Sequence, residues 1–319
     1  MTTTIALAGK GGVGKTTVAA MVIKYLAQSG RGAIFAIDAD PSSNLNMVLG
    51  LDLEWTVGEI REGMLSKVKE SITAGGAAMG GLPSGMSKRE HLDYEIRCSL
   101  SEGIEFDLIA MGRGEGRGCY CAVNHNLREV IDAIGDQYSF VVVDNEAGME
   151  HLSRRTTRDV QHLLIVSDPS QRGIVAAGRI AGFRNELDIN IENAYLIVNR
   201  LPDGEIPPAL QEAIDAIDVP LLGVIPETRD VTEFEFSGRP LVEMKDDSPV
   251  YQAVNALHAS PQELRGCIEE PLTHADSRRH YRRVRRTPHL QRSAARSGRV
   301  DDRTVAGSDP VSDRDRLPR

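Results

Sequence analysis

The stretch Gly9-Lys10-Gly11-Gly12-Val13-Gly14-Lys15-Thr16-Thr17 decides the fold of this chain. It places a glycine, four residues and then Gly-Lys-Thr in the spacing of a phosphate-binding loop. An apolar run at residues 3–8 fits a buried strand and residues 18–27 fit a helix, so the loop joins the two elements that the motif requires. We predict that it binds a nucleoside triphosphate. The alternative, a glycine-rich connection that binds nothing, leaves the complete pattern unexplained.

The residues of this loop have separate expected roles. The glycines let backbone amides turn inward around phosphate oxygens, and the N-terminus of the following helix adds partial positive charge. The Lys15 ammonium is expected to reach the β- and γ-phosphates, and the Thr16 hydroxyl to ligate Mg²⁺. The residues expected to bind the nucleotide here are Gly11, Gly12, Val13, Gly14, Lys15, Thr16 and Thr17.

Composition and charge predict a cytoplasmic protein. The 319 residues, 41% of them hydrophobic, leave room for one large α/β domain with a sizeable core. Four cysteines at scattered spacings favour a reducing compartment, and no apolar run approaches the ~18 residues of a membrane span. Residues 261–319 hold 14 Arg and 9 Asp or Glu, which gives this segment a net charge of +5. Because the whole chain carries −9, residues 1–260 carry −14. Such an acidic body is a poor match for nucleic acid, and we expect neither a nucleic-acid nor a membrane partner.

Strands that alternate with helical patterns predict the architecture. Seven apolar runs fit buried strands, at residues 3–8, 32–37, 106–111, 140–144, 162–167, 194–200 and 221–227. This alternation is typical of a doubly wound, mainly parallel sheet of about seven strands with helices on both faces. Between the strands we expect helices at residues 49–71 and 91–100, and a mobile loop at residues 74–88.

The chain divides near residue 258. Residues 1–258 are expected to form one P-loop ATPase domain. Residues 259–319 lose apolar periodicity and are rich in arginine, which favours a disordered tail. The basic cluster at residues 278–286 leaves open an arm for an anionic surface, although a solvated tail fits its composition better.

Aspartates follow two of the predicted strands. Asp38 and Asp40 come at the end of the second strand, and Asp144 ends the fourth in the Walker B form. Ligands bind at the carboxyl ends of the strands in a doubly wound sheet. We therefore expect Asp144 to hold a water of the Mg²⁺ shell, and Asp38 to support that shell and its loop. The alternative that Asp38 and Asp40 only cap the next helix stays open.

A Cys-x-Cys pair, Cys119 and Cys121, follows the third strand within a glycine-rich stretch. Arg113 and Arg117 lie nearby in sequence and would lower the pKa of the two thiols. Thiolates suit Zn²⁺, Cu(I), iron–sulfur clusters and square-planar Ni²⁺. Two cysteines leave a four-coordinate site half made, which a two-fold dimer would complete. The pair on its own is equally compatible with two small buried residues.

Lys10 is a second lysine within the phosphate loop. With it, the run Lys-Gly-Gly-Val-Gly-Lys-Thr-Thr resembles the deviant phosphate loops of the MinD, ParA, ArsA and nitrogenase iron protein group. The resemblance implies that Lys10 reaches the partner's phosphates in a nucleotide-sandwich homodimer, and that Asp40 positions the attacking water. It also implies a base-binding set of Asn199, Arg200, Pro226 and Glu227.

Several segments resemble the CooC type of nickel-insertion ATPase, which matures carbon monoxide dehydrogenase. They are residues 80–88, 111–113, 118–124, 126–128 and 145–155. The resemblance implies that Cys119 and Cys121 of two chains bind one Ni²⁺ or Zn²⁺ at the dimer interface, and that apo carbon monoxide dehydrogenase is the partner. Gly114 and Arg117 stand where that family is expected to have prolines, which predicts a more mobile metal loop.

Two other functions are compatible with parts of the sequence. An iron–sulfur electron carrier like the nitrogenase iron protein would also bridge a dimer with two cysteines per chain. That family takes them from well-separated segments, and Cys98 with Cys119 fits this poorly. A positioning switch of the MinD or ParA kind acts on membrane or DNA, and the Arg-rich tail has no sustained apolar face for such a role. Acetyl-CoA synthase maturation proteins share much of the pattern.

Overall fold

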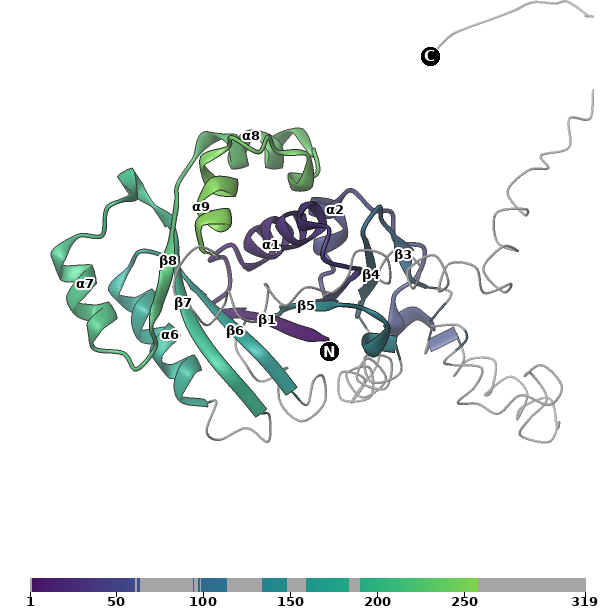
Figure 1. The fold of residues 1–319 in the computed structure, drawn as a ribbon, viewed down its shortest axis with the longest axis horizontal. Coiled ribbons are helices and arrows are strands. Elements are labelled where there is room, and N and C mark those ends of the chain that lie inside the picture. Colours follow the sequence, from purple (N-terminus) through teal and green to yellow (C-terminus); the bar gives the residue numbers. More distant parts are fainter. Residues whose placement is uncertain are drawn as a thin grey trace, which may run out of the picture.

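The computed structural model describes residues 2–60, 62–63, 94, 97, 99–113, 134–147, 159–183 and 190–257. These residues form an eight-stranded sheet in the order β3-β4-β2-β5-β1-β6-β7-β8 (Figure 1). The strands are β1 (Thr3–Gly9), β2 (Ile34–Ala39), β3 (Ser101–Glu102), β4 (Phe106–Ala110), β5 (Phe140–Asn145), β6 (Asp159–Ser167), β7 (Asn190–Leu201) and β8 (Leu221–Pro226). All neighbouring pairs are parallel except β3 with β4. The predicted doubly wound, mainly parallel sheet is confirmed.

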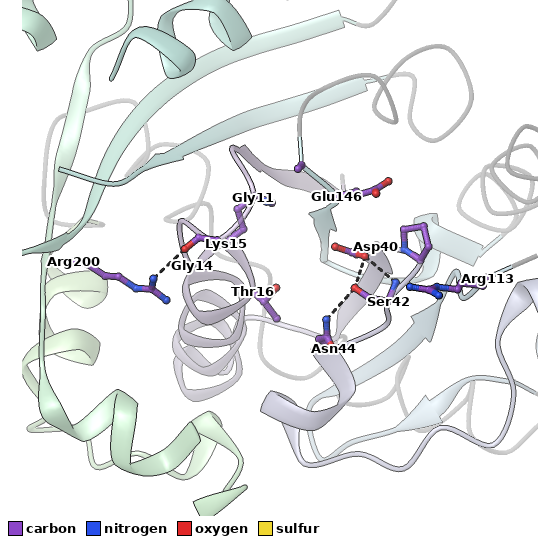
Figure 2. A pocket seen from close by; sticks show the side chains of 13 residues that line it. Gly11, Gly14, Lys15, Thr16, Asp40, Ser42, Asn44, Arg113, Glu146 and Arg200 are labelled. Atoms are coloured by element: carbon purple, nitrogen blue, oxygen red, sulfur yellow. Dashed lines mark hydrogen bonds between the residues drawn. The ribbon is translucent and has the colours of Figure 1, made fainter. Parts of the chain in front are cut away.

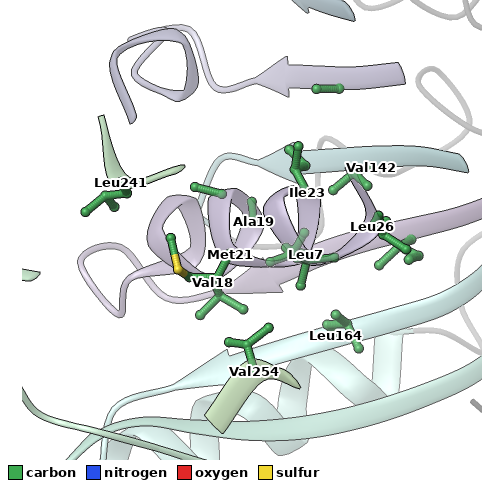
Figure 3. Close-up of a cluster of buried hydrophobic side chains, with 14 of the residues drawn as sticks. Leu7, Val18, Ala19, Met21, Ile23, Leu26, Val142, Leu164, Leu241 and Val254 are labelled. Carbon is green, nitrogen blue, oxygen red and sulfur yellow. The ribbon is translucent and has the colours of Figure 1, made fainter. Parts of the chain in front are cut away.

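Helices cover both faces of the sheet (Figure 1). They are α1 (Lys15–Ser29), α2 (Leu45–Leu49), α6 (Gln171–Phe183), α7 (Pro208–Asp215), α8 (Arg229–Ser237) and α9 (Pro249–Leu257), with 3-10 turns η1 (Gly135–Gln137), η2 (Pro202–Gly204) and η3 (Leu241–Glu243). One buried cluster packs α1, α2 and α9 against one face, and a second packs α6 and α7 against the other. Figure 3 shows the first cluster, where Leu7 and Val142 of the sheet meet Ile23 and Leu26 of α1. Two buried faces explain why the central strands are apolar throughout.

The order of the strands brings the predicted acidic residues to one edge. β1 lies between β5 and β6, and Leu7 is in register with Asp144. Asp38 of β2 is in register with the same Asp144. Because these strands are parallel, their carboxyl ends meet where β1 enters the phosphate loop, the usual place for a ligand in such a sheet.

Two expectations were incomplete or wrong. The antiparallel strand β3 was not predicted, because two residues are too few to show any alternation. The predicted helix 49–71 is wrong over residues 50–56. Helix α2 ends at Leu49 because the amide of Gly50 turns back to the carbonyls of Asn46 and Met47, and helix resumes at residue 57.

Other expectations fall outside the described residues. They concern most of the helix at 91–100, the loop at 74–88 and the tail at 259–319, so the domain boundary near residue 258 stays a prediction. Among the helices that the structure describes, none is long and apolar enough to cross a membrane.

Candidate functional site

The phosphate loop joins the end of β1 to the first residue of α1. Gly14 precedes the helix in a left-handed conformation, with φ of 91°. A Cβ atom at this position would lie 2.3 Å from Nδ2 of Asn199, so both the dihedral and the space require glycine. Asn199 itself donates from Nδ2 to the Val13 carbonyl at 2.8 Å, and Arg200 donates to the Gly12 carbonyl at 3.0 Å. The loop is therefore fixed by two side chains from the end of β7.

Lys15 and Thr16 begin helix α1 and point into the loop. The Lys15 ammonium is buried and donates to the carbonyls of Gly9 and Lys10, both at 3.3 Å. Burial lowers the pKa of Lys15, while the carboxylates of Asp144 and Asp40 act in the opposite direction. The Thr16 hydroxyl donates to Oδ2 of Asp144 at 2.6 Å. The structure therefore brings Lys15, Thr16 and Asp144 together at the start of α1.

Asp144 has an oxygen left for a further ligand. Its Oδ1 is buried and has no hydrogen-bond partner among the described residues. Burial raises the pKa of Asp144 to about 6, although the Thr16 hydroxyl and the Lys15 ammonium oppose the shift. A free carboxylate oxygen beside a hydroxyl is the hard, oxygen-only donor set that Mg²⁺ prefers. These residues fit the predicted Mg²⁺ shell.

Asp38 organises the loop that carries Asp40. It is fully buried, and its two oxygens accept from the amides of Asp40, at 3.1 Å, and Leu45, at 2.8 Å. Burial raises the pKa of Asp38 to about 7, and the Asp144 carboxylate adds to the shift, while the Leu45 amide opposes it. Because backbone amides engage both of its oxygens, Asp38 supports the loop that carries Asp40.

A pocket of about 500 Å³ opens between these elements (Figure 2). Asp40 lines it, with Oδ1 accepting from the amide and hydroxyl of Ser42 at 2.8 and 2.5 Å. The other lining residues are Gly11, Gly12, Gly14, Lys15, Thr16, Pro41, Ser42, Asn44, Arg113, Glu146, Ala147 and Arg200. A second pocket, of about 270 Å³, is lined by Thr17, Asn199, Arg200, Pro226, Glu227 and residues of α8 and α9. Arg200 lines both pockets, so the two pockets are neighbours.

Some lining residues were not predicted to face this pocket. Ser42 and Asn44 hydrogen-bond to each other at 3.0 Å, and the Asp-Pro-Ser-x-Asn turn is the signal that marks them. Glu146 follows the Walker B strand, and the sequence marks it only as part of the segment at residues 145–155 that resembles CooC. Arg113 lines this pocket, and its predicted effect on the thiols stays a prediction because Cys119 and Cys121 lie outside the described residues.

The structure does not place the predicted thiolate site. Cys119 and Cys121 lie outside the described residues, as does Arg117. Across the part of the chain that is described, no group of three or more His, Cys, Asp or Glu side chains could hold a metal ion. Lys10 is exposed at the loop, and its expected role concerns a second chain.

A glycine loop joins a parallel strand to a helix here, Lys15, Thr16 and Asp40 line one pocket, and Asp144 accepts from the Thr16 hydroxyl. These features define a P-loop nucleotide-binding protein. Residues 4–241 match the CobQ/CobB/MinD/ParA nucleotide binding domain, and the chain belongs to this family of ATP-binding proteins.

Known relatives agree with this assignment. The chain is 38% identical over 257 residues to an uncharacterized ATP-binding protein of Methanocaldococcus jannaschii, covering 79% of this chain and 96% of the relative. It is 30% identical over 223 residues to the carbon monoxide dehydrogenase accessory protein CooC of Rhodospirillum rubrum, covering 70% and 82%. The septum site-determining protein MinD of Pyrococcus horikoshii, solved with Mg-ADP, shares the fold with a TM-score of 0.59 at 24% identity. That match covers 85% of this chain and all of the other.

Proposed function

We propose that this chain is a Mg²⁺-dependent ATPase that works as a homodimer and inserts nickel during the maturation of carbon monoxide dehydrogenase. The observation that carries the ATPase proposal is the pocket of about 500 Å³ around Lys15, Thr16 and Asp40. The nickel proposal is supported by Cys119 and Cys121 together with the similarity to CooC. The coarser assignment to the MinD and ParA family holds whichever metal or target is served.

In the proposed reaction the loop amides and Lys15 bind the phosphates. The Thr16 hydroxyl and a water on Asp144 would hold Mg²⁺, which neutralises phosphate charge when it is bound. Oδ1 of Asp40 is engaged by Ser42. Oδ2 of Asp40 is then available to accept from a water and orient it toward the terminal phosphate.

The homodimer is proposed because two parts of the sequence each need a second chain. Lys10 is exposed at the loop, and its ammonium would contact the partner's phosphates as a cation supplied in trans. Two thiolates from each of two chains would complete a four-coordinate site for Ni²⁺ or Zn²⁺. ATP binding and hydrolysis would then control when this shared site holds or releases its cargo.

The second candidate is a positioning ATPase of the MinD or ParA kind. Likeness to MinD structures favours it, for example that of Pyrococcus furiosus with a TM-score of 0.58. At 25% identity this likeness speaks for the ATPase machinery that both candidates share. An iron–sulfur electron carrier would require a chromophore that absorbs visible light.

The experiment is a metal titration of the purified apoprotein, with oligomeric mass measured in parallel. The wild type should bind one Ni²⁺ or Zn²⁺ per dimer, and a variant with Cys119→Ser and Cys121→Ser should bind none. A matched variant, Cys98→Ser with Cys267→Ser, should titrate as the wild type does. Metal binding that survives loss of the Cys-x-Cys pair would overturn the nickel proposal and leave a positioning ATPase.

A further inference from the structure

Arg113 follows β4 and lines the phosphate pocket, where no sequence motif had placed it. Figure 2 shows it beside Ser42 and Asp40, across the pocket from Arg200. Among the described residues its guanidinium has neither an ion pair nor a hydrogen bond, although the carboxylates of Asp40 and Glu146 line the same pocket. Within the described part of the chain, this cation at the pocket therefore has no protein partner.

The backbone just before Arg113 is held at Met111 by two hydrogen bonds. The amide of Met111 donates to the Asp38 carbonyl at 2.8 Å, and the Met111 carbonyl accepts from the Gly58 amide at 3.0 Å. The first bond ties Met111, two residues before Arg113, to β2, the strand that Asp40 follows. The chain therefore enters Arg113 from a backbone held against the strand that leads to Asp40.

Gly112 directs the chain into the pocket. It has a left-handed φ of 65°, and a Cβ there would lie 2.2 Å from Oγ1 of Thr56 and 2.3 Å from its Cβ. Thr56 cannot easily move, because its amide and hydroxyl donate to the Glu59 carboxylate, both at 2.8 Å, and its hydroxyl accepts from the Glu59 amide. Both dihedral and packing require glycine before Arg113.

The two pockets indicate which phosphate Arg113 would meet. Arg200 lines both the phosphate pocket and the second pocket beside β8, whereas Arg113 lines only the first. A nucleotide with its base in the second pocket would extend its phosphates past Arg200 into the first pocket, where Arg113 lies beside Asp40. ADP is one phosphate shorter and would reach less far toward Arg113.

We propose that Arg113 binds the terminal phosphate of ATP and makes the site discriminate ATP from ADP. A guanidinium offers two parallel donors to phosphate oxygens, and it would balance the two carboxylates at this end of the pocket. The proposal rests on the proposed ATPase function, and it adds a residue that senses the terminal phosphate. It needs neither the cysteines nor a bound nickel ion.

The test compares two nucleotides in the wild type and four variants. Affinities for ADP and for the non-hydrolysable adenylyl-imidodiphosphate are measured at one Mg²⁺ concentration in the wild type, Arg113→Ala, Arg113→Lys and Arg179→Ala. Arg179 is an exposed arginine on α6, so Arg179→Ala removes one positive charge from the protein, as Arg113→Ala does. Arg113→Ala should lose roughly 10- to 100-fold in affinity for the ATP analogue, the range for a lost charge-assisted hydrogen bond. Its ADP affinity should stay within about twofold of wild type, since ADP lacks this contact.

The other variants sharpen the test. Arg113→Lys should be intermediate, because lysine keeps the charge but cannot make two parallel bonds. Gly112→Ala should also lose the preference for the ATP analogue while Arg113 is still present. Equal losses for both nucleotides in Arg113→Ala, or no loss for either, would overturn the proposal. A failed nickel titration would leave it standing, so the two proposals fail separately.

Discussion

Replacing Asn199 tests how the phosphate loop is held. In Asn199→Ala the Val13 carbonyl loses its donor at 2.8 Å. Asn199 is 4% exposed, so water does not readily take the place of that donor. An orphaned buried acceptor costs about 1–3 kcal/mol of unfolding free energy. At about 2 kcal/mol, we expect the Tm of the apoprotein to fall by roughly 4–8 °C for a domain of this size.

The same variant should bind nucleotide more weakly. If nucleotide binding must restore the order that the loop has lost, the cost of about 2 kcal/mol is taken from the binding free energy. This corresponds to a loss of affinity of up to roughly 30-fold. Differential scanning fluorimetry and calorimetric titration with Mg-ADP measure the two effects. Asn193→Ala is the control, because Asn193 lies on the same strand and donates to the Gln161 carbonyl at a longer 3.4 Å. If Asn199→Ala kept the wild-type Tm but lost a preference for ATP over GTP, Asn199 would not be the residue that holds the loop. It would then contact the base of the nucleotide.

Three further predictions follow from the described contacts. Lys24→Met should lower the free energy of unfolding, measured by urea titration, by about 2 kcal/mol, because the buried Lys24 ammonium donates to the Met244 carbonyl. The control Lys245→Met, at an exposed lysine, should have little effect. Equal losses in the two variants would contradict a stabilising role for the Lys24 contact. Burial lowers the pKa of His162, so its stabilising contribution is present above about pH 6.5 and is lost as the pH falls below that value. In His162→Leu, the fall of the unfolding free energy with decreasing pH should become shallower by up to ~1.4 kcal/mol per pH unit. An unchanged slope of unfolding free energy against pH would contradict this prediction. Removing Mg²⁺ with a chelator should weaken the binding of an ATP analogue, measured by calorimetry, more in the wild type than in Thr16→Ala. Equal weakening in the two proteins would show that Thr16 does not ligate Mg²⁺.

The sequence predicted the sheet well because its signals are local. Each central strand is buried on both faces and reads as an apolar run, and the phosphate loop fixes which strand and helix it joins. The strand-end positions of Asp38 and Asp144 then placed both residues at one edge without any structure. The two-residue strand β3 carried no such signal.

Contacts between distant segments could not be predicted in the same way. That Asn199 braces the loop follows from a 2.8 Å contact across 186 residues of sequence. Nothing in the sequence linked Arg113 to the Asp40 loop, and only the pairing of β4 with β2 brings the two together. Sheet order, and not sequence distance, decides which side chains share the pocket.

The most direct test of the central claim is complementation between two inactive variants. Lys10→Ala should bind ATP but not hydrolyse it, because the missing cation belongs to the partner's site. Asp40→Asn should lack the residue that orients water in its own site. When the two are mixed, a mixed dimer has one site with Asp40 from one chain and Lys10 from the other. With random pairing, turnover per chain should recover to about a quarter of the wild-type value. Failure of the mixture to hydrolyse ATP, or full turnover by Lys10→Ala alone, would contradict a site shared between two chains.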